Sequence, residues 1–190
     1  QCTDITPTTL PCDNTSTWLG IAGCSDEASP TYISLVGASL TGTLPAQLRL
    51  LKNLTKLELS YNSLHGSIPP SLGELSRLNF LDAGYNSFSG SIPSALGDLD
   101  RLKDLMVDGN PDLRGRVPAE LCTLGALRTI YFADPATNAT GLACYPSCLS
   151  SVSTLAAGDL PTCEELDATA AEAEAGAGPR WQWHFILLVG

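Results

Sequence analysis

The sequence predicts an α/β solenoid: a short right-handed coil of about five turns with a concave parallel β-sheet and disulfide-stapled caps. Two observations carry this prediction. Marker residues such as Leu54, Leu78 and Leu102 recur 24 positions apart. The seven cysteines lie only near the two ends of the repeats. A repeat of this length forms one coil that cannot bury its apolar face alone, so neighbouring coils must stack.

Each repeat begins with a short strand. In the segment LTKLELSYN, Leu57 and Leu59 alternate with Lys56 and Glu58, so the leucines point inward and the other side chains face solvent. Asn62 ends the strand, where a buried amide can satisfy backbone groups freed by the turn. Asparagines recur at positions 86 and 110, so we expect them to bridge successive coils.

The remainder of each repeat leads the chain over the convex side. Gly66 allows a turn that is closed to larger residues, and Ile68-Pro69 favours an extended segment whose proline needs no hydrogen-bond donor. Leu72 and Leu75 then fill the core from the convex side.

The pattern LxxLxLxxNxLxGxIPxxLGxL resembles the plant-specific class of leucine-rich repeats, found in receptor-kinase ectodomains and polygalacturonase-inhibiting proteins. The first and fifth copies depart from it, with Ala38 and Pro135 in place of the asparagine, as end repeats do. We expect four regions: an N-terminal cysteine cap at 1–31, leucine-rich repeats at 32–133, a C-terminal cysteine cap at 134–163, and an acidic Ala/Glu/Gly linker with an apolar strand-like tail at 164–190.

The start at Gln1, with no methionine and no signal peptide, suggests the mature end of a processed secreted chain. The cysteines likewise favour an oxidising, extracellular location. The segment from Trp18 to Cys24 resembles the plant N-terminal cap, which implies the pair Cys12–Cys24 and leaves Cys2 as a free thiol, an intermolecular bridge or a partner of another cysteine. At the other end we expect the pairs Cys122–Cys148 and Cys144–Cys163. Three sequons, at Asn14, Asn53 and Asn138, are candidate N-glycan sites, with Asn53 facing water.

Catalysis and metal binding are not expected. The only histidines are His65 and His184, no nucleophile has an evident base, and CYPSC lacks partners at metal spacing. We therefore predict no enzyme activity, no cofactor and no metal. A net charge of −10 disfavours nucleic acid and anionic membranes, and no apolar run is long enough to span a bilayer.

The outward positions of the strands are the predicted binding surface. Apolar side chains among charges on a face that meets water are typical of protein interfaces, although the tyrosines of the YN pairs could also pack there for structural reasons. The candidate partner-binding residues are Lys56, Glu58, Tyr61, Phe80, Asp82, Tyr85, Met106, Asp108 and Tyr131.

The C-terminal segment carries a second prediction. Residues 164–174 have helical composition, ended by Gly176 and Gly178. The apolar residues beyond them form a candidate assembly tail that could cap its own chain, dock on a neighbouring copy or begin a membrane anchor: Trp181, Trp183, Phe185, Ile186, Leu187, Leu188 and Val189. The sequence predicts a non-enzymatic extracellular interaction module at a cell surface, wall or filament; a structural subunit and a secreted inhibitor of a wall-degrading enzyme are the alternatives.

Overall fold

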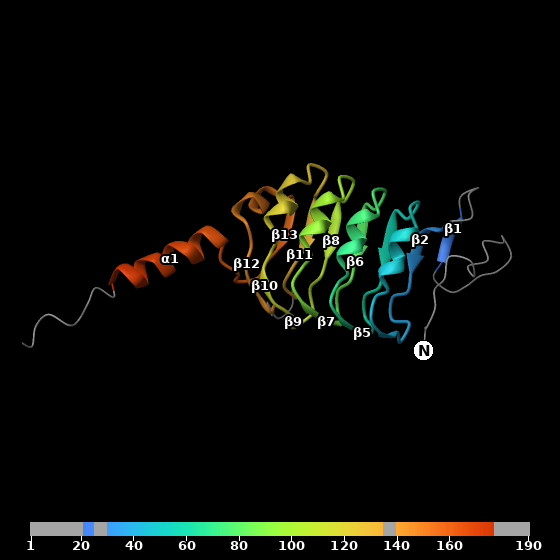
Figure 1. Cartoon of the computed structure of the whole chain (residues 1–190), viewed down its shortest axis with the longest axis horizontal. Coiled ribbons are helices and arrows are strands. Elements are labelled where there is room, and N and C mark those ends of the chain that lie inside the picture. Colours follow the sequence, from blue (N-terminus) through green and yellow to red (C-terminus); the bar gives the residue numbers. More distant parts are fainter. Residues whose placement is uncertain (1–20, 25–29, 135–139, 177–190) are drawn as a thin grey trace, which may run out of the picture.

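The computed structural model describes residues 21–24, 30–134 and 140–176. It shows a solenoid with a long sheet along one side and short 3₁₀-helices along the other (Figure 1). The seven strands of the long sheet are, in spatial order, β1 (Ile21–Cys24), β2 (Pro30–Ser34), β4 (Lys56–Glu58), β6 (Phe80–Asp82), β8 (Asp104–Met106), β11 (Thr129–Tyr131) and β13 (Thr154–Ala156). All pair in parallel except β1, which is antiparallel to β2.

Shorter elements complete each coil. A second row of parallel strands follows the asparagine turns: β3 (Thr41–Gly42), β5 (Ser63–Gly66), β7 (Ser87–Gly90) and β9 (Asp112–Leu113), with β10 (Gly115–Arg116) paired to β12 (Leu142–Cys144). The convex side carries η1 (Ala46–Leu50), η2 (Pro70–Glu74), η3 (Ser94–Asp98), η4 (Ala119–Thr123) and η5 (Ser147–Ser151). The short solenoid predicted from the repeat is confirmed. Its fifth coil, from β11 to η5, extends into the segment assigned above to the C-terminal cap.

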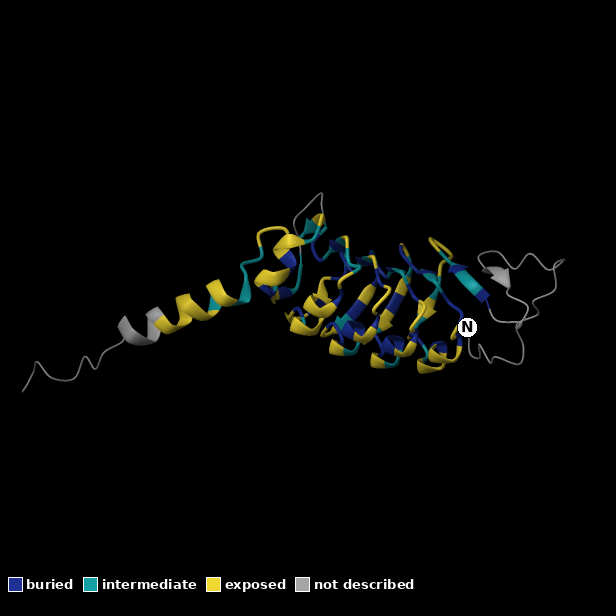
Figure 2. Cartoon of the chain, turned by 90° about the horizontal axis from the view of Figure 1, so that it is seen from above, coloured by how far each residue is buried: buried dark blue, intermediate teal, exposed yellow. Residues whose placement is uncertain are grey.

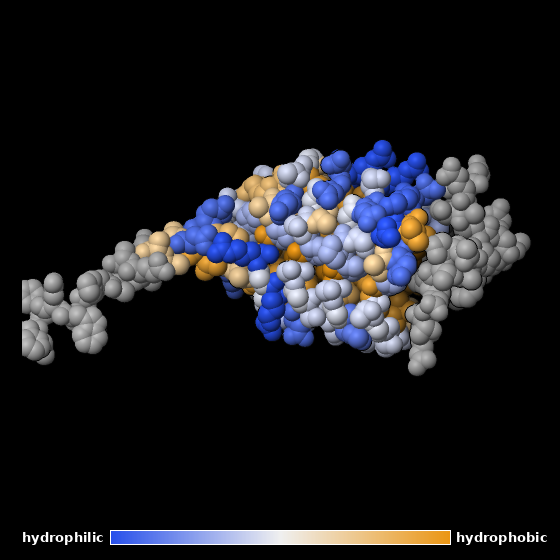
Figure 3. Space-filling model, in the orientation of Figure 1, coloured by the Kyte–Doolittle hydropathy of each residue, from blue (hydrophilic) through white to orange (hydrophobic). Residues whose placement is uncertain are grey.

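The core is the leucine stack predicted by the repeat. Leu57, Leu81 and Leu105 pair across adjacent strands, and all three are fully buried. Leu72 and Leu75 meet them from the convex side and are fully buried as well. Figure 2 shows the buried parts of the chain inside the coil and exposed residues along its outer turns. Hydrophobic residues therefore appear only as small separate patches on the face seen in Figure 3.

An asparagine ladder links the coils as expected. Asn86 Nδ2 donates to the carbonyl of Leu59 in the preceding coil at 3.0 Å and to that of Gly84 at 2.9 Å. Its Oδ1 accepts from Leu64 N at 3.1 Å. Asn62 and Asn110 repeat this pattern on either side. Because each amide serves backbone groups of two coils, the ladder fixes the stacking register as well as the turn.

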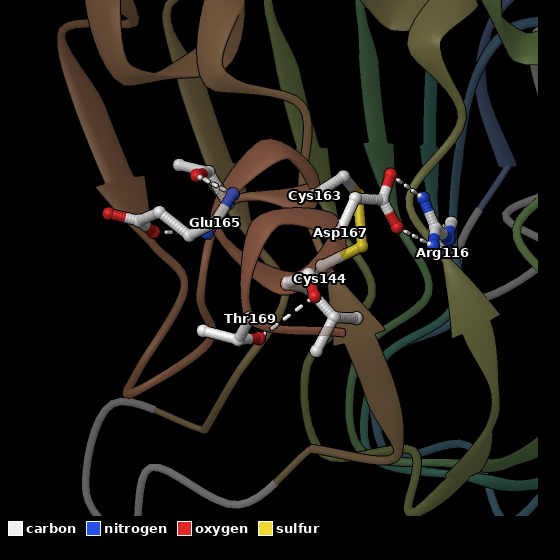
Figure 4. A network of polar contacts seen from close by, with 8 residues as sticks. Arg116, Cys144, Cys163, Glu165, Asp167 and Thr169 are labelled. Carbon is white, nitrogen blue, oxygen red and sulfur yellow. Dashed lines mark hydrogen bonds and ion pairs between the residues drawn. A yellow bond between two sulfur atoms is a disulfide. The ribbon is translucent and has the colours of Figure 1, made fainter. Parts of the chain in front are cut away.

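The C-terminal end is fastened by two disulfides, Cys122–Cys148 and Cys144–Cys163, the pairs expected from the sequence, with Cα atoms 5.9 Å and 5.0 Å apart. The second bridge joins β12 to the start of α1 (Cys163–Gly176), which confirms the predicted helix. Figure 4 shows Arg116 pairing with Asp167 on α1 beside this bridge. Among the described helices, none has the length and apolar character needed to cross a membrane.

Several sequence-based expectations lie outside the described residues: the Cys12–Cys24 pair, the role of Cys2, the sequons at Asn14 and Asn138, and the tail from Trp181 to Val189.

For the third sequon, the expectation that the side chain faces water is wrong. Asn53 is only 8% exposed, and its Oδ1 accepts a 2.7 Å hydrogen bond from Arg77 Nη1 in the next coil. Arg77 stands one repeat later and covers this asparagine, a contact between coils that one repeat alone does not predict.

Candidate partner-binding face

The outward side chains of the long sheet form two rows, which we call the concave face. The sheet register aligns Tyr32, Lys56, Phe80, Asp104 and Thr129 in one row. The same register aligns Ser34, Glu58, Asp82, Met106 and Tyr131 in the other. All ten are half-buried, since neighbouring strands shield their sides and leave their ends in solvent.

Lys56 organises the N-terminal half of the concave face. Its Nζ lies 5.1 Å from the ring centre of Tyr32 and 4.5 Å from that of Phe80, and it pairs with Glu58 Oε1 at 2.7 Å. Glu58 also accepts a hydrogen bond from the Tyr32 hydroxyl. The hydrogen bond to Glu58 raises the pKa of Lys56. Burial alone would raise the pKa of Glu58, but hydrogen bonds from Lys56 and Tyr32 outweigh it and lower that pKa. These four residues therefore form an internally neutralised cluster.

The next carboxylates of the sheet have no such counter-charge. Gly84 leaves room for two of them: a Cβ atom at this position would lie 3.1 Å from Asp108 Oδ1 and 3.3 Å from Asp82 Oδ1. Asp82 Oδ1 accepts from Gly84 N at 3.0 Å. Asp108, expected to contact a partner, is instead only 4% exposed, which corrects that assignment. It lies past the end of β8, where the chain turns inward, so the strand alternation no longer keeps its side chain outside.

Burial, together with the neighbouring carboxylates of Asp82 and Asp134, raises the pKa of Asp108 from 3.8 to about 6. Because this pKa is higher in the folded state, the protonated carboxyl stabilises the fold below about pH 4, and this stability is lost as the pH rises through 6. We expect Asp108→Asn to raise the free energy of unfolding by about 1–3 kcal/mol at pH 7 relative to the parent and by almost nothing at pH 4. Urea unfolding of both proteins at the two pH values measures this. A pH-independent difference would contradict it.

Tyr61 and Tyr85 stand at the edge of the concave face, directly after the strands. Their rings stack with centres 4.5 Å apart and planes 5° from parallel. Both have left-handed backbones, with φ of 58° and 49°, which bulky residues rarely adopt. Burial and the carboxylates of Asp108 and Asp134 raise the pKa of Tyr85 to about 12, so its hydroxyl stays protonated at neutral pH.

The structure thus brings together eight of the nine predicted binding residues on one face and its edge and withdraws Asp108 into the turn. Sequence reasoning missed Tyr32, which lies in register with Lys56 and contributes both a ring and a hydroxyl to the cluster. Its position 24 residues before Lys56 was the available signal. In the described part of the chain, no three His, Cys, Asp or Glu side chains are grouped so that they could hold a metal ion.

Comparisons with known proteins agree with this geometry. The family model named Leucine Rich Repeat matches residues 53–75 and 77–99. No curated protein sequence matches the chain. Among solved structures, the BIR2 ectodomain from Arabidopsis thaliana is 26% identical, with a TM-score of 0.63 over 80% of this chain and 83% of that one.

Two further structures from Arabidopsis thaliana are similar. A chain of the BIR3–SERK2 complex is 26% identical, with a TM-score of 0.63 over 82% of this chain and 87% of that one. The LRR ectodomain of the receptor kinase SOBIR1 has the same fold at 23% identity, with a TM-score of 0.63 over 82% of this chain and 90% of that one. The chain is therefore built of leucine-rich repeats, and its solenoid is of the kind found in plant receptor-kinase ectodomains.

Proposed function

We propose that the chain is an extracellular protein-interaction module that binds a protein partner through the concave face. The observation that carries the proposal is the position of Phe80, Met106 and Tyr131, three large side chains held half-exposed on adjacent strands among charged neighbours. Such anchors, desolvated on binding, supply most of the affinity of protein interfaces. One of the similar structures is a complex of two proteins, BIR3 and SERK2, which supports a protein-binding function.

The charge of the chain narrows the class of partner. The sequence carries a net charge of −10, and the described concave strands present Asp82 and Asp104 with Lys56 as their only cation, already paired with Glu58. Complementary charges speed association and suppress wrong partners. A basic or neutral protein surface therefore fits this face better than an acidic one.

The test is a triple variant, Phe80→Ser, Met106→Ser and Tyr131→Ser. A partner is first captured from the source tissue by the parent chain and purified, and its affinity for each protein is measured by titration calorimetry. We expect the triple variant to lose at least about 100-fold in affinity, since each truncated anchor costs on the order of 1 kcal/mol or more. Its far-ultraviolet circular dichroism should match that of the parent.

The matched control changes three exposed convex residues, Gln47→Ser, Asp98→Ser and Arg101→Ser. This control should bind as the parent does. Equal affinity of the folded concave variant and the parent would move the interface away from the concave face, and a loss confined to the control would place it on the convex side.

The finer alternatives stay predictions from the sequence. Self-assembly through the tail and a filament role depend on residues beyond the described part of the chain, and the inhibitor role depends on the resemblance of the repeat. N-linked glycans, an extracellular location and the absence of enzyme activity are part of this proposal and also stay predictions.

A further inference from the structure

One row of residues follows the concave strands and has an unusual composition. Gly37, Tyr61, Tyr85 and Gly109 occupy equivalent places in successive coils and all have left-handed backbones, with φ of 62°, 58°, 49° and 64°. Glycine adopts this conformation without strain, whereas tyrosine does not. Since the fold uses glycine at two of these places, the turn itself does not require a ring at the other two. The tyrosines therefore point to a role beyond the turn.

The two rings form a stack that is closed at one end and open at the other. At Gly109, an added Cβ atom would fall 2.8 Å from Tyr85 Cδ1, so the backbone there lies against the Tyr85 ring. At Gly37, an added Cβ atom would meet nothing nearer than 4.0 Å, which leaves space beside Tyr61. Tyr61 is 60% exposed, and Val36 next to Gly37 is 49% exposed. The free end of the stack is thus the outer face of Tyr61.

Carboxylates lie on the Tyr85 side of the stack. Asp82 and Asp104 on the concave strands, and Asp108 behind Tyr85, form no ion pair with another described residue. The same face already contains one cation between rings, because Lys56 lies within 5.1 Å of the ring centres of Tyr32 and Phe80. A flat ring surface selects a planar group, and the carboxylates select a positive charge.

We propose that the outer face of Tyr61, above Gly37, is the docking point for an arginine side chain of a basic protein partner. The guanidinium group is both planar and permanently charged, so it can stack on the ring while Asp82 and Asp104 of the concave face attract the rest of a basic segment. A lysine ammonium has the charge without the plane, and a sugar or a neutral ring can stack but has no charge. This proposal deepens the proposed function and rests on it for the class of partner.

The experiment titrates the full chain with blocked pentapeptides that differ at one position, carrying arginine, citrulline or lysine among glycine and serine. Ring resonances of Tyr61 and Tyr85 are followed by aromatic carbon–proton NMR. We expect the arginine peptide to shift the Tyr61 signals saturably. The citrulline and lysine peptides should bind at least about fivefold more weakly than the arginine peptide. Citrulline is the sharpest control because it keeps the plane and removes only the charge.

Two variants locate the site. Tyr61→Gly suits the left-handed backbone, should not lower the melting temperature, and should weaken the binding of the arginine peptide. Asparagine also tolerates a left-handed backbone, and in Gly37→Asn its side chain would fill the open space above Gly37. This variant should therefore weaken arginine-peptide binding while leaving the Tyr61 ring in place. Gln47→Ser, at an exposed position on the convex side, is the control and should bind the arginine peptide as the parent does.

Three results would overturn the proposal: equal shifts from the citrulline peptide, undiminished peptide binding by Tyr61→Gly, or stronger Tyr61 shifts from cellohexaose than from the arginine peptide. The proposed function is judged separately, by the partner affinity of the concave triple variant. Loss of that affinity without any arginine effect would leave the interaction module standing and remove only the arginine site.

Discussion

Replacing Asn86 by alanine is expected to lower the free energy of unfolding by about 2–5 kcal/mol. The variant would leave the buried Leu64 amide without its partner and would remove one of the donors to each of the Leu59 and Gly84 carbonyls, which would keep Asn62 Nδ2 and Tyr61 N. Each buried group left without a partner costs on the order of 1–3 kcal/mol. Guanidinium unfolding followed by circular dichroism measures the loss.

Asn62→Ala is the matched control, because Asn62 makes the same kind of contacts but is half-buried, so water can replace part of them. We expect a smaller loss for it. If Asn86→Ala has the same free energy of unfolding as the parent, the asparagine ladder does not have the structural role described above. The same holds if Asn62→Ala loses more of this free energy than Asn86→Ala.

Leu81→Ala is expected to cost about 3–5 kcal/mol in the same measurement. Leu81 is fully buried at the middle of the sheet, between Leu57 and Leu105, where packed coils on both sides prevent collapse of the cavity. Asp98→Ala, at an exposed position in η3, is the control and should remain within about 0.5 kcal/mol of the parent. A loss below about 1 kcal/mol for Leu81→Ala would show that the coils relax into the space.

Most of the fold follows from the sequence because each coil repeats the same local chemistry. The alternation of Leu57 and Leu59 with polar residues predicts the strand, and Asn62 with Gly66 predicts the turn and the return of the chain. The period then predicts which strands pair, since equivalent residues of stacked coils must lie side by side. The helix α1 follows in the same way from its local composition.

The candidate site is less accessible to this reasoning because it depends on how side chains of different coils meet. Alternation assigns Asp108 to the surface, but the inward turn after β8 buries it. Nothing in a single repeat predicts that Lys56 lies between Tyr32 and Phe80, or that Arg77 covers Asn53. The stack of Tyr61 on Tyr85 depends on a left-handed backbone, which the pair YN does not reveal.

The attachment of α1 has a mechanical consequence. The helix leaves the last coil as an arm of 14 residues, or about 21 Å at 1.5 Å per residue. A pull on its far end would reach the solenoid through the covalent Cys144–Cys163 bridge and the Arg116–Asp167 pair, with Cys122–Cys148 clamping the next layer. Tension would therefore be shared by two coils, and rupture should begin among the hydrogen bonds of the sheet. Reducing both bridges should lower the force at which the last coil unwinds in a single-molecule pulling experiment.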